Sequence, residues 1–126
     1  MPEKVLISIV DDDESVRHAI QGLMRSSGFA AESFASAEDF LTSSHPPRTD
    51  FLIADVQMPG MSGLDLHRHL VASGQHIPLI LITAYPDDRM RTRALEAGVI
   101  AYLVKPFNED DLLVWIREAL VHNQQG

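Results

Sequence analysis

Five polar side chains stand where apolar runs of this chain stop, and their types could support chemistry on a charged oxygen group. They are Asp11, Asp12, Asp55, Thr83 and Lys105. Three carboxylates a few ångströms apart cannot all stay ionised without a counter-charge. A hard divalent cation would supply that charge, and Mg²⁺ suits the role because it binds through one or two carboxylates and keeps waters and substrate oxygens. If these residues meet, we expect a magnesium site.

A lysine and a threonine beside such a cation would suit phosphoryl transfer, where catalysis is mostly positioning and neutralisation of oxygen charge. The chain has no cysteine, and no serine or histidine is suitably placed, so a carboxylate is the available nucleophile. Asp55 is the strongest candidate. Four apolar residues end in it, and the turn residues Pro59, Gly60 and Gly63 follow.

Each of these residues also has a structural interpretation when it is taken alone. The acids at 11–13 could be the solvated start of a helix. Thr83 could cap the helix that follows it, and Lys105 could be a surface lysine. Their common position at the ends of strands favours a shared site.

Hydrophobic periodicity predicts the elements that would position these side chains. Strands are expected at residues 5–10, 30–34, 51–55, 79–82 and 99–104, and helices at 15–27, 36–42, 62–71, 86–97 and 108–121. Strand and helix alternate five times, which predicts an α/β domain with a parallel sheet and helices on both faces, the weak run 30–34 being an edge strand. The carboxyl ends of parallel strands share one edge, where ligands bind, so the five side chains should converge.

Local signals predict where several helices begin. Ser36 and Ser62 are each followed three residues later by aspartate, as in a capping box. Pro86 is expected in the first turn of the fourth helix, and Asn108 is expected to cap the last one. Helical spacing predicts that the last helix buries Leu112, Trp115, Ile116, Ala119 and Leu120.

Length and composition predict one domain over residues 1–122, followed by a polar tail over 123–126 that could begin a linker. A net charge of −8 makes the chain a poor binder of nucleic acid, because phosphate contacts need lysine and arginine. No apolar run approaches the ~20 residues of a membrane span, and the amino terminus carries no signal peptide. We therefore expect a cytoplasmic protein that contacts neither membrane nor nucleic acid.

Four blocks of sequence resemble the receiver domain of two-component response regulators, over essentially the whole chain. Two further segments are most similar to the FixJ-like branch of nitrogen-fixation regulators. They are Ser-Ala-Glu-Asp-Phe-Leu and Met-Ser-Gly-Leu-Asp-Leu. The resemblance implies a CheY-like, flavodoxin-like three-layer sandwich with a five-stranded parallel sheet of order 2-1-3-4-5. The four blocks are Ile-Val-Asp11-Asp12-Asp13-Glu14, Asp55-Val-Gln-Met-Pro59-Gly-Met-Ser-Gly63, Ile82-Thr83-Ala84 and Tyr102-Leu-Val-Lys105-Pro106-Phe107.

The resemblance also implies roles at the site. Asp55 would accept a phosphoryl group from a phosphohistidine on a sensor histidine kinase. Asp12 and Asp55 would bind Mg²⁺ directly, together with the backbone carbonyl of Gln57, while Asp11 would act largely through water. Mn²⁺ would be a substitute for Mg²⁺.

A conformational switch is implied as well. Lys105 would pair with the phosphoryl group, Thr83 would move to hydrogen-bond it, and Tyr102 would turn inward as Thr83 moves. The structural alternative for Tyr102 is a packing aromatic at the sheet edge, and the family pattern favours the switch. The Lys105–Pro106 peptide bond would be cis, and a phosphorylation-dependent homodimer would form through the fourth helix and fifth strand. The switch would control an output domain or partner, in transcription regulation.

Two departures from the family pattern bear on this reading. Tyr85 and Pro86 follow Thr83-Ala84, where the family often has a small or acidic residue, and such neighbours help to set how fast an acyl phosphate is hydrolysed. Relatives in the FixJ-like branch also carry a DNA-binding domain, which this sequence lacks. The sequence is then either an excised fragment or a stand-alone receiver that shuttles phosphate or switches a binding partner.

Two other classes of function fit this sequence less well. A metal-dependent phosphatase would use Asp55 as a turnover nucleophile, but it usually needs a second acid two residues later, where this chain has Gln57, and it needs a cap over its substrate. A flavodoxin-like cofactor binder would need a phosphate-binding loop after the first strand, where Asp-Asp-Asp-Glu would repel phosphate. We therefore expect a phosphoacceptor that assists its own phosphorylation and dephosphorylation, and no turnover enzyme.

The remaining charged residues give weaker signals. The six histidines form no ligand pattern and are expected to be structural or on the surface: His18, His45, His67, His69, His76 and His122. Three arginines on the predicted fourth helix are either a solvated face or a basic strip in a dimer: Arg89, Arg91 and Arg93. Both interpretations of the arginines stay open.

Overall fold

The computed structural model describes residues 4–44 and 46–125 of the chain. Its strands form one parallel sheet in the order β2-β1-β3-β4-β5. This confirms the predicted α/β class, the strand order and the edge position of the weak strand. The strands are β1 (Leu6–Val10), β2 (Ala30–Phe34), β3 (Phe51–Asp55), β4 (Leu79–Thr83) and β5 (Ala101–Val104).

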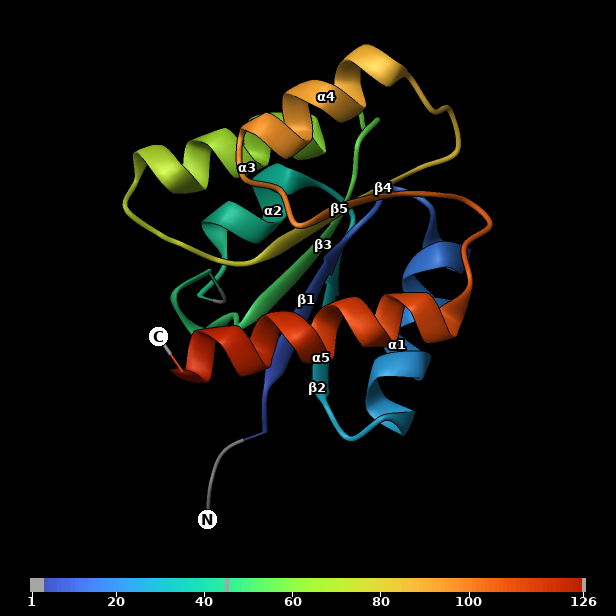
Figure 1. Ribbon diagram of the computed structural model, residues 1–126, viewed down its shortest axis with the longest axis vertical. Helices are drawn as coiled ribbons and strands as arrows, with labels where there is room; N and C mark the ends of the chain where they lie inside the picture. Colours follow the sequence, from blue (N-terminus) through green and yellow to red (C-terminus); the bar gives the residue numbers. More distant parts are fainter. Residues whose placement is uncertain (1–3, 45, 126) are drawn as a thin grey trace.

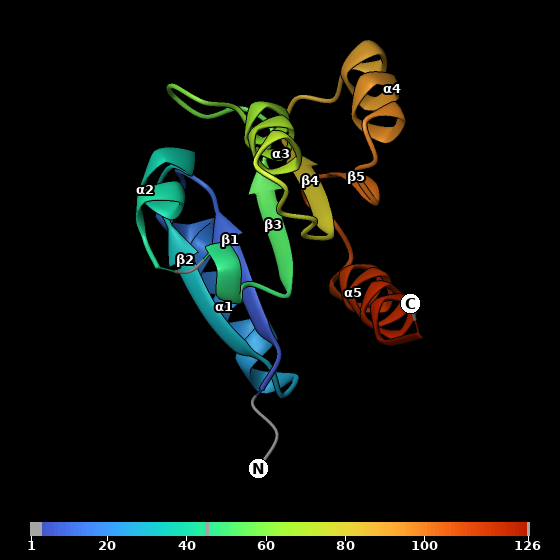
Figure 2. The same ribbon diagram turned by 90° about the vertical axis from the view of Figure 1, so that its left-hand side faces the viewer.

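Helices cover both faces of the sheet (Figures 1 and 2). One core cluster joins the helices α2, α3 and α4 to one face, and a second joins α1 and α5 to the other. The bounds are α1 (Glu14–Ser26), α2 (Ala37–Thr42), α3 (Gly63–Ala72), α4 (Asp88–Glu96) and α5 (Glu109–Gln125), with a 3₁₀ turn η1 (Pro46–Arg48). No helix in the described ranges is both long and apolar enough to cross a membrane.

The central strands are mostly apolar because helices cover both of their faces, and their few polar residues are Ser8, Asp55 and Thr83. Every residue of β1, β3 and β4 is buried. In the register of the sheet, Val10 lies opposite Ala54, Asp55 opposite Ile82 and Thr83 opposite Val104. The carboxyl ends of four neighbouring strands are therefore level, and the polar residues that follow them meet at one edge.

Capping explains where several helices begin. Ser62 and Asp65 form a complete capping box at α3, in which each side chain accepts a hydrogen bond from the other residue's backbone N–H. Ser36 accepts from the backbone N–H of Asp39 at α2. Asn108 accepts from the backbone N–H groups of Asp110 and Asp111 at α5. These three starts are as the sequence predicted.

Two local predictions were wrong. Pro86 does not lie in the first turn of α4, because Asp87 caps that helix by accepting hydrogen bonds from Arg89 and Met90. Trp115 is not a core residue: it is 38% exposed, whereas Leu112 and Ile116 are fully buried. The buried stripe of α5 is centred on positions 112, 116 and 119, with Leu113 packed on its flank, and Trp115 is left on the solvent side.

The predicted polar tail and two of the histidines lie at or beyond the limits of the described residues. The α5 helix continues to Gln125, so residues 123–125 of the expected tail are helical. The division into a domain and a linker stays a prediction. His45 and the side chain of His122 lie outside the described part of the chain.

Candidate functional site

Three carboxylates meet at the carboxyl edge of the sheet. Ligand oxygens of Asp11, Asp12 and Asp55 all lie within 4.8 Å of one another. Asp11 and Asp12 follow β1 and Asp55 ends β3, so the parallel pairing of these two strands brings them together. Asp11 is fully buried and Asp55 is 6% exposed, whereas Asp12 is exposed.

Lys105 reaches this cluster from the end of β5. Its Nζ donates to Oδ2 of Asp11 at 2.9 Å and to Oδ2 of Asp55 at 3.2 Å. Burial alone would lower the pKa of Lys105, but its hydrogen bonds and charge interactions with the two carboxylates outweigh burial, and its pKa is raised. The side chain is therefore a charged ammonium that bridges Asp11 and Asp55.

The pKa of Asp55 is raised even though the ammonium of Lys105 lies beside it. Its pKa is raised, first because burial penalises the ionised form and also because Asp11 carries the same charge. The backbone N–H of Gln57, which donates to Oδ1 at 3.1 Å, and the ammonium of Lys105 act in the opposite direction. The net result is that the ionised form of Asp55 is less favourable here than in water, and further positive charge nearby would stabilise it.

The donor set fits the cation that the sequence predicted. Three hard carboxylate oxygens in reach of one another, one of them on an exposed residue, match the preference of Mg²⁺ for oxygen ligands with room for water. Burial and then the charge of Asp11 raise the pKa of Asp55, and a cation there would favour its ionised form. The backbone carbonyl of Gln57 lies in the loop that follows Asp55, and its role as a ligand stays a prediction.

The remaining predicted residues lie on or directly after the strands β4 and β5. Thr83 is fully buried at the end of β4, and its Oγ1 accepts a hydrogen bond from the backbone N–H of Tyr85 at 3.0 Å. Tyr102 is 9% exposed, and its Oη accepts from the backbone N–H of Asp87 at 3.3 Å. The Lys105–Pro106 bond is cis, as the resemblance implied.

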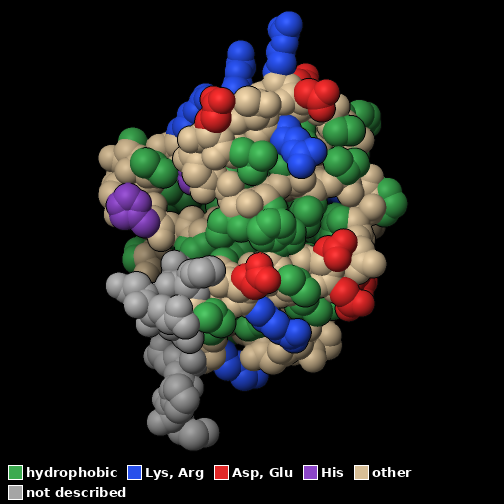
Figure 3. Space-filling model, in the orientation of Figure 1, with side chains coloured by type: hydrophobic (Ala, Val, Ile, Leu, Met, Phe, Trp, Pro, Cys, Tyr) green, Lys and Arg blue, Asp and Glu red, His purple; other side chains and the backbone are tan. Residues whose placement is uncertain are grey.

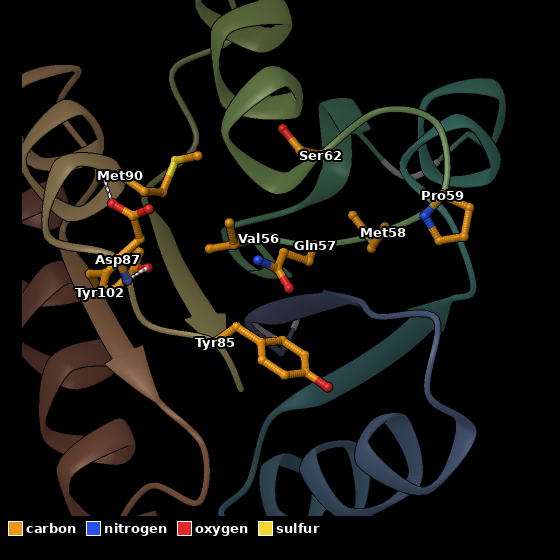
Figure 4. Close-up of a pocket in the computed structure, with 9 residues that line it drawn as sticks. All are labelled: Val56, Gln57, Met58, Pro59, Ser62, Tyr85, Asp87, Met90 and Tyr102. Atoms are coloured by element: carbon orange, nitrogen blue, oxygen red, sulfur yellow. Dashed lines mark hydrogen bonds between the residues drawn. The ribbon is translucent and has the colours of Figure 1, made fainter.

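A cavity of about 510 Å³ opens next to these residues. Figure 4 shows Tyr102 beside Asp87 on one side of it, and Tyr85 below Gln57. Tyr85 is 71% exposed. The cavity thus joins the loop after Asp55 to the loop after Thr83, which are the two backbone segments next to the site.

The structure also brings in residues that sequence reasoning missed. Arg17, on α1, donates from Nη1 to the backbone carbonyl of Asp11 at 2.8 Å. Glu38, on α2, accepts from the backbone N–H of Met61 in the loop after β3. The position of Arg17, one turn into the helix that follows Asp11, was a signal for the first contact. No sequence pattern pointed to the second.

The described histidines take no part in the cluster. His67 is 7% exposed on α3, and its Nε2 lies 2.9 Å from the backbone carbonyl of Ala97, so it ties α3 to the end of α4. His18 lies 3.8 Å from Glu14 on the exposed face of α1. His67 thus has a structural role and His18 lies on the surface, as expected.

Comparison with known proteins identifies one family. The model of the response regulator receiver domain matches residues 7–117. The chain is 44% identical over 118 residues to the response regulator protein TmoT of Ectopseudomonas mendocina, covering 94% of this chain and 54% of TmoT. It is 35% identical over 120 residues to the transcriptional regulatory protein FixJ of Azorhizobium caulinodans, covering 95% of this chain and 57% of FixJ.

A solved structure agrees with these matches. The crystal structure of FixJ-N superposes with a TM-score of 0.84 at 34% identity, over 96% of this chain and 97% of that one. The chain spans about half the length of the curated relatives that it matches. The similarity therefore concerns one part of those proteins.

Proposed function

Because this chain belongs to the response regulator receiver domain family and so to two-component phosphorelays, we propose that Asp55 is its phosphoacceptor. The observation that carries the proposal is the cluster itself. A buried carboxylate with a raised pKa lies beside a lysine ammonium and within 4.8 Å of two further carboxylates. A carboxylate in this position is suited to attack phosphorus. The carboxylate and the phosphoryl group both carry negative charge, and the lysine ammonium lies where it can neutralise part of that charge.

The proposed donor is a phosphohistidine on a sensor histidine kinase. A carboxylate oxygen of Asp55 attacks the phosphorus, a P–O bond forms, and the P–N bond to the imidazole breaks. The electron pair of the broken bond stays on the imidazole nitrogen, which takes up a proton. The product is an acyl phosphate on Asp55.

The other side chains hold and neutralise charge during this step. Asp12 and Asp55 would hold Mg²⁺ or Mn²⁺, with the carbonyl of Gln57, while Asp11 would act largely through water. The bound cation supplies positive charge to the phosphoryl oxygens. Lys105 already bridges Asp11 and Asp55, and its ammonium would pair with a phosphoryl oxygen.

Phosphorylation would then shift a conformational equilibrium. The hydroxyl of Thr83 would turn to hydrogen-bond the phosphoryl group, leaving the backbone N–H of Tyr85 that it now binds. Tyr102 would change together with Thr83. Its hydrogen bond to Asp87 at the start of α4 offers a route from the site to that helix.

The test is intact-protein mass spectrometry after incubation with acetyl phosphate. We expect the mass of one phosphoryl group to be gained in the presence of Mg²⁺ and not in the presence of EDTA, because the carboxylate cluster repels the anionic donor without a cation. Ca²⁺ is the matched control, since its larger size and looser geometry fit a magnesium site poorly. We expect little gain of mass with Ca²⁺. No gain of mass in the presence of Mg²⁺ would contradict the proposal.

The output face proposed for the phosphorylated state lies on α4 and β5. Figure 3 shows a band of hydrophobic side chains between α4 and α5. Leu95 of α4 and Val104 of β5 are each 43% exposed, and Trp115 lies on α5. Arg89, Arg91 and Arg93 are exposed on α4. An apolar strip with a charged rim supports a homodimer through α4 and β5.

Size-exclusion chromatography tests this face. We expect the phosphorylated chain to elute earlier than the unphosphorylated chain, and Val104→Lys to abolish the shift by placing a charge in the apolar strip. Val71→Lys is the matched control, because Val71 is similarly exposed but lies on α3, which is not part of the proposed face. An unchanged elution volume on phosphorylation would contradict the dimer.

The proposed partners are thus a sensor histidine kinase, a second copy of the chain, and an output domain that acts in transcription. The acidic charge of −8 argues against direct binding of nucleic acid by this domain. A cytoplasmic location stays a prediction. A phosphate shuttle or protein-binding switch is the alternative, and the same phosphorylation chemistry would serve it.

A further inference from the structure

The loop between β3 and α3 has a contact that the phosphorelay chemistry does not use. The backbone N–H of Met61 donates to Oε2 of Glu38 on α2, 3.2 Å away. The same carboxylate lies against Gly60, because a Cβ built on Gly60 would come 2.5 Å from Oε2. Gly60 has a φ of +80°, a conformation that glycine adopts readily. Glu38 is therefore held against two successive residues of the loop.

Packing fixes the helix that carries Glu38. Phe40, on the same helix, is fully buried and packs edge-on against Phe34 at the end of β2, with ring centroids 5.3 Å apart. Met58 and Met61 of the loop pack against the same core cluster as Phe40. Figure 4 shows the loop passing Pro59 beside the teal helix that Figure 1 labels α2. The carboxylate thus projects from a firmly placed helix.

Both ends of the loop are tied to the last residue of β3 or to Val56, which follows it. At its start, the N–H of Gln57 donates to Asp55, and at its end the N–H of Gly63 donates to the carbonyl of Val56 at 3.2 Å. Glu38 supplies a tether in the middle, from a different element. A loop that loses a central tether samples more conformations, and the directions of its carbonyl groups then vary.

We infer that Glu38 is a positioning residue, which holds the loop 57–62 in the conformation that presents the backbone of Gln57 beside Asp55. The contact with Met61 stands on its own, whereas its consequence for Mg²⁺ binding rests on the proposed function. Glu38 is exposed, and within residues 4–44 and 46–125 no hydrogen bond or ion pair joins it to the acidic cluster or to Lys105. It would act through the loop.

Two variants of Glu38 separate the effect of its side-chain length from the effect of its charge. Glu38→Asp keeps the charge but shortens the side chain by one carbon, so that it no longer reaches Met61. Glu38→Gln loses the charge but keeps an oxygen at the same reach. Asp39→Asn is the control, because it removes a charge from the neighbouring exposed position of α2.

The first measurement is amide hydrogen exchange of Met61 in the metal-free protein. We expect exchange about 5-fold faster in Glu38→Asp, since a surface hydrogen bond contributes a factor of this order. Glu38→Gln should stay within about 2-fold of the wild type. The second is calorimetric titration with Mg²⁺, where Glu38→Asp should bind about 3-fold to 5-fold more weakly, because the loss is limited to what one surface hydrogen bond contributes. Glu38→Gln and Asp39→Asn should bind close to the wild type.

The outcomes separate this inference from the proposed function. Glu38→Asp with wild-type exchange at Met61 and wild-type Mg²⁺ affinity would overturn the inference. A loss of affinity in Glu38→Gln and Asp39→Asn, but not in Glu38→Asp, would overturn it too, because charge and not reach would then be the cause. Absence of Mg²⁺ binding in the wild type would overturn the proposed function, and exchange at Met61 would still decide whether the tether exists.

Discussion

Replacing Asp55 with asparagine is expected to abolish phosphoryl uptake from acetyl phosphate while leaving the fold intact. The amide has nearly the shape of the carboxylate, but its oxygen is a poor nucleophile and a weak ligand for Mg²⁺. Intact-protein mass spectrometry should find no gain of mass in the variant under conditions that label the wild type. This is the largest functional effect that we expect from a single substitution.

Stability should not fall in the same variant. Burial and the charge of Asp11 raise the pKa of Asp55, so the ionised side chain is disfavoured in the folded protein at pH values above that pKa, and asparagine removes the cost. Lys105 keeps its hydrogen bond to Asp11. Thermal unfolding with Mg²⁺ gives a second measurement: the midpoint should rise for the wild type and much less for Asp55→Asn, because a bound ligand stabilises the folded state.

The control for this pair of measurements is Asp110→Asn, in the exposed first turn of α5. It should take up one phosphoryl group and respond to Mg²⁺ as the wild type does. Labelling of Asp55→Asn to the wild-type extent would mean that the acceptor lies elsewhere. If Mg²⁺ raised the unfolding midpoint of Asp55→Asn as much as that of the wild type, Asp55 would not be a ligand of the cation.

The second large effect is expected on stability, from Gly63→Ala. A Cβ at this first residue of α3 would overlap the backbone carbonyl of Asp55 and come 2.7 Å from Cδ2 of Leu81. Both neighbours belong to the buried central strands, so neither can move cheaply. Overpacking of this kind lowers the free energy of unfolding by about 3 kcal/mol, which should lower the thermal midpoint by about 10 °C.

Gly22→Ala is the matched control, with the opposite sign expected. Gly22 lies in the exposed interior of α1, and a Cβ there would meet nothing within 4 Å. Alanine has the better helix propensity, so the free energy of unfolding should rise by about 0.5–1 kcal/mol. Equal midpoints for the two alanine variants, measured by circular dichroism, would show that α3 does not approach β3 as closely as described.

The strands and the polar residues at their ends could be predicted from one pattern, which is an apolar run that stops at a polar residue. A fully buried parallel strand reads as an apolar run, so the run before Asp55 located β3 at its observed bounds. Parallel strands have their carboxyl ends at one edge of the sheet, which is why Asp11 and Lys105 could be expected to meet although 94 residues separate them. The capping box of Ser62 and Asp65 was likewise local, and the structure confirms it.

What escaped prediction depends on packing between elements. Trp115 fits the helical spacing of a buried face as well as Ile116 does, and only the orientation of α5 on the sheet decides between them. Asp87, and not Pro86, sets the start of α4, because its carboxylate accepts the first free N–H groups. The tether from Glu38 joins a helix to a loop 23 residues away, and no sequence spacing encodes it.

The most direct test of the central claim is to locate the phosphoryl group chemically. After Mg²⁺-dependent labelling, borohydride reduces an aspartyl phosphate to homoserine, which tandem mass spectrometry of peptides can place in the sequence. We predict homoserine at position 55, and only in samples that contained the phosphoryl donor and Mg²⁺. Homoserine at position 11 or 12, with aspartate intact at 55, would contradict the account.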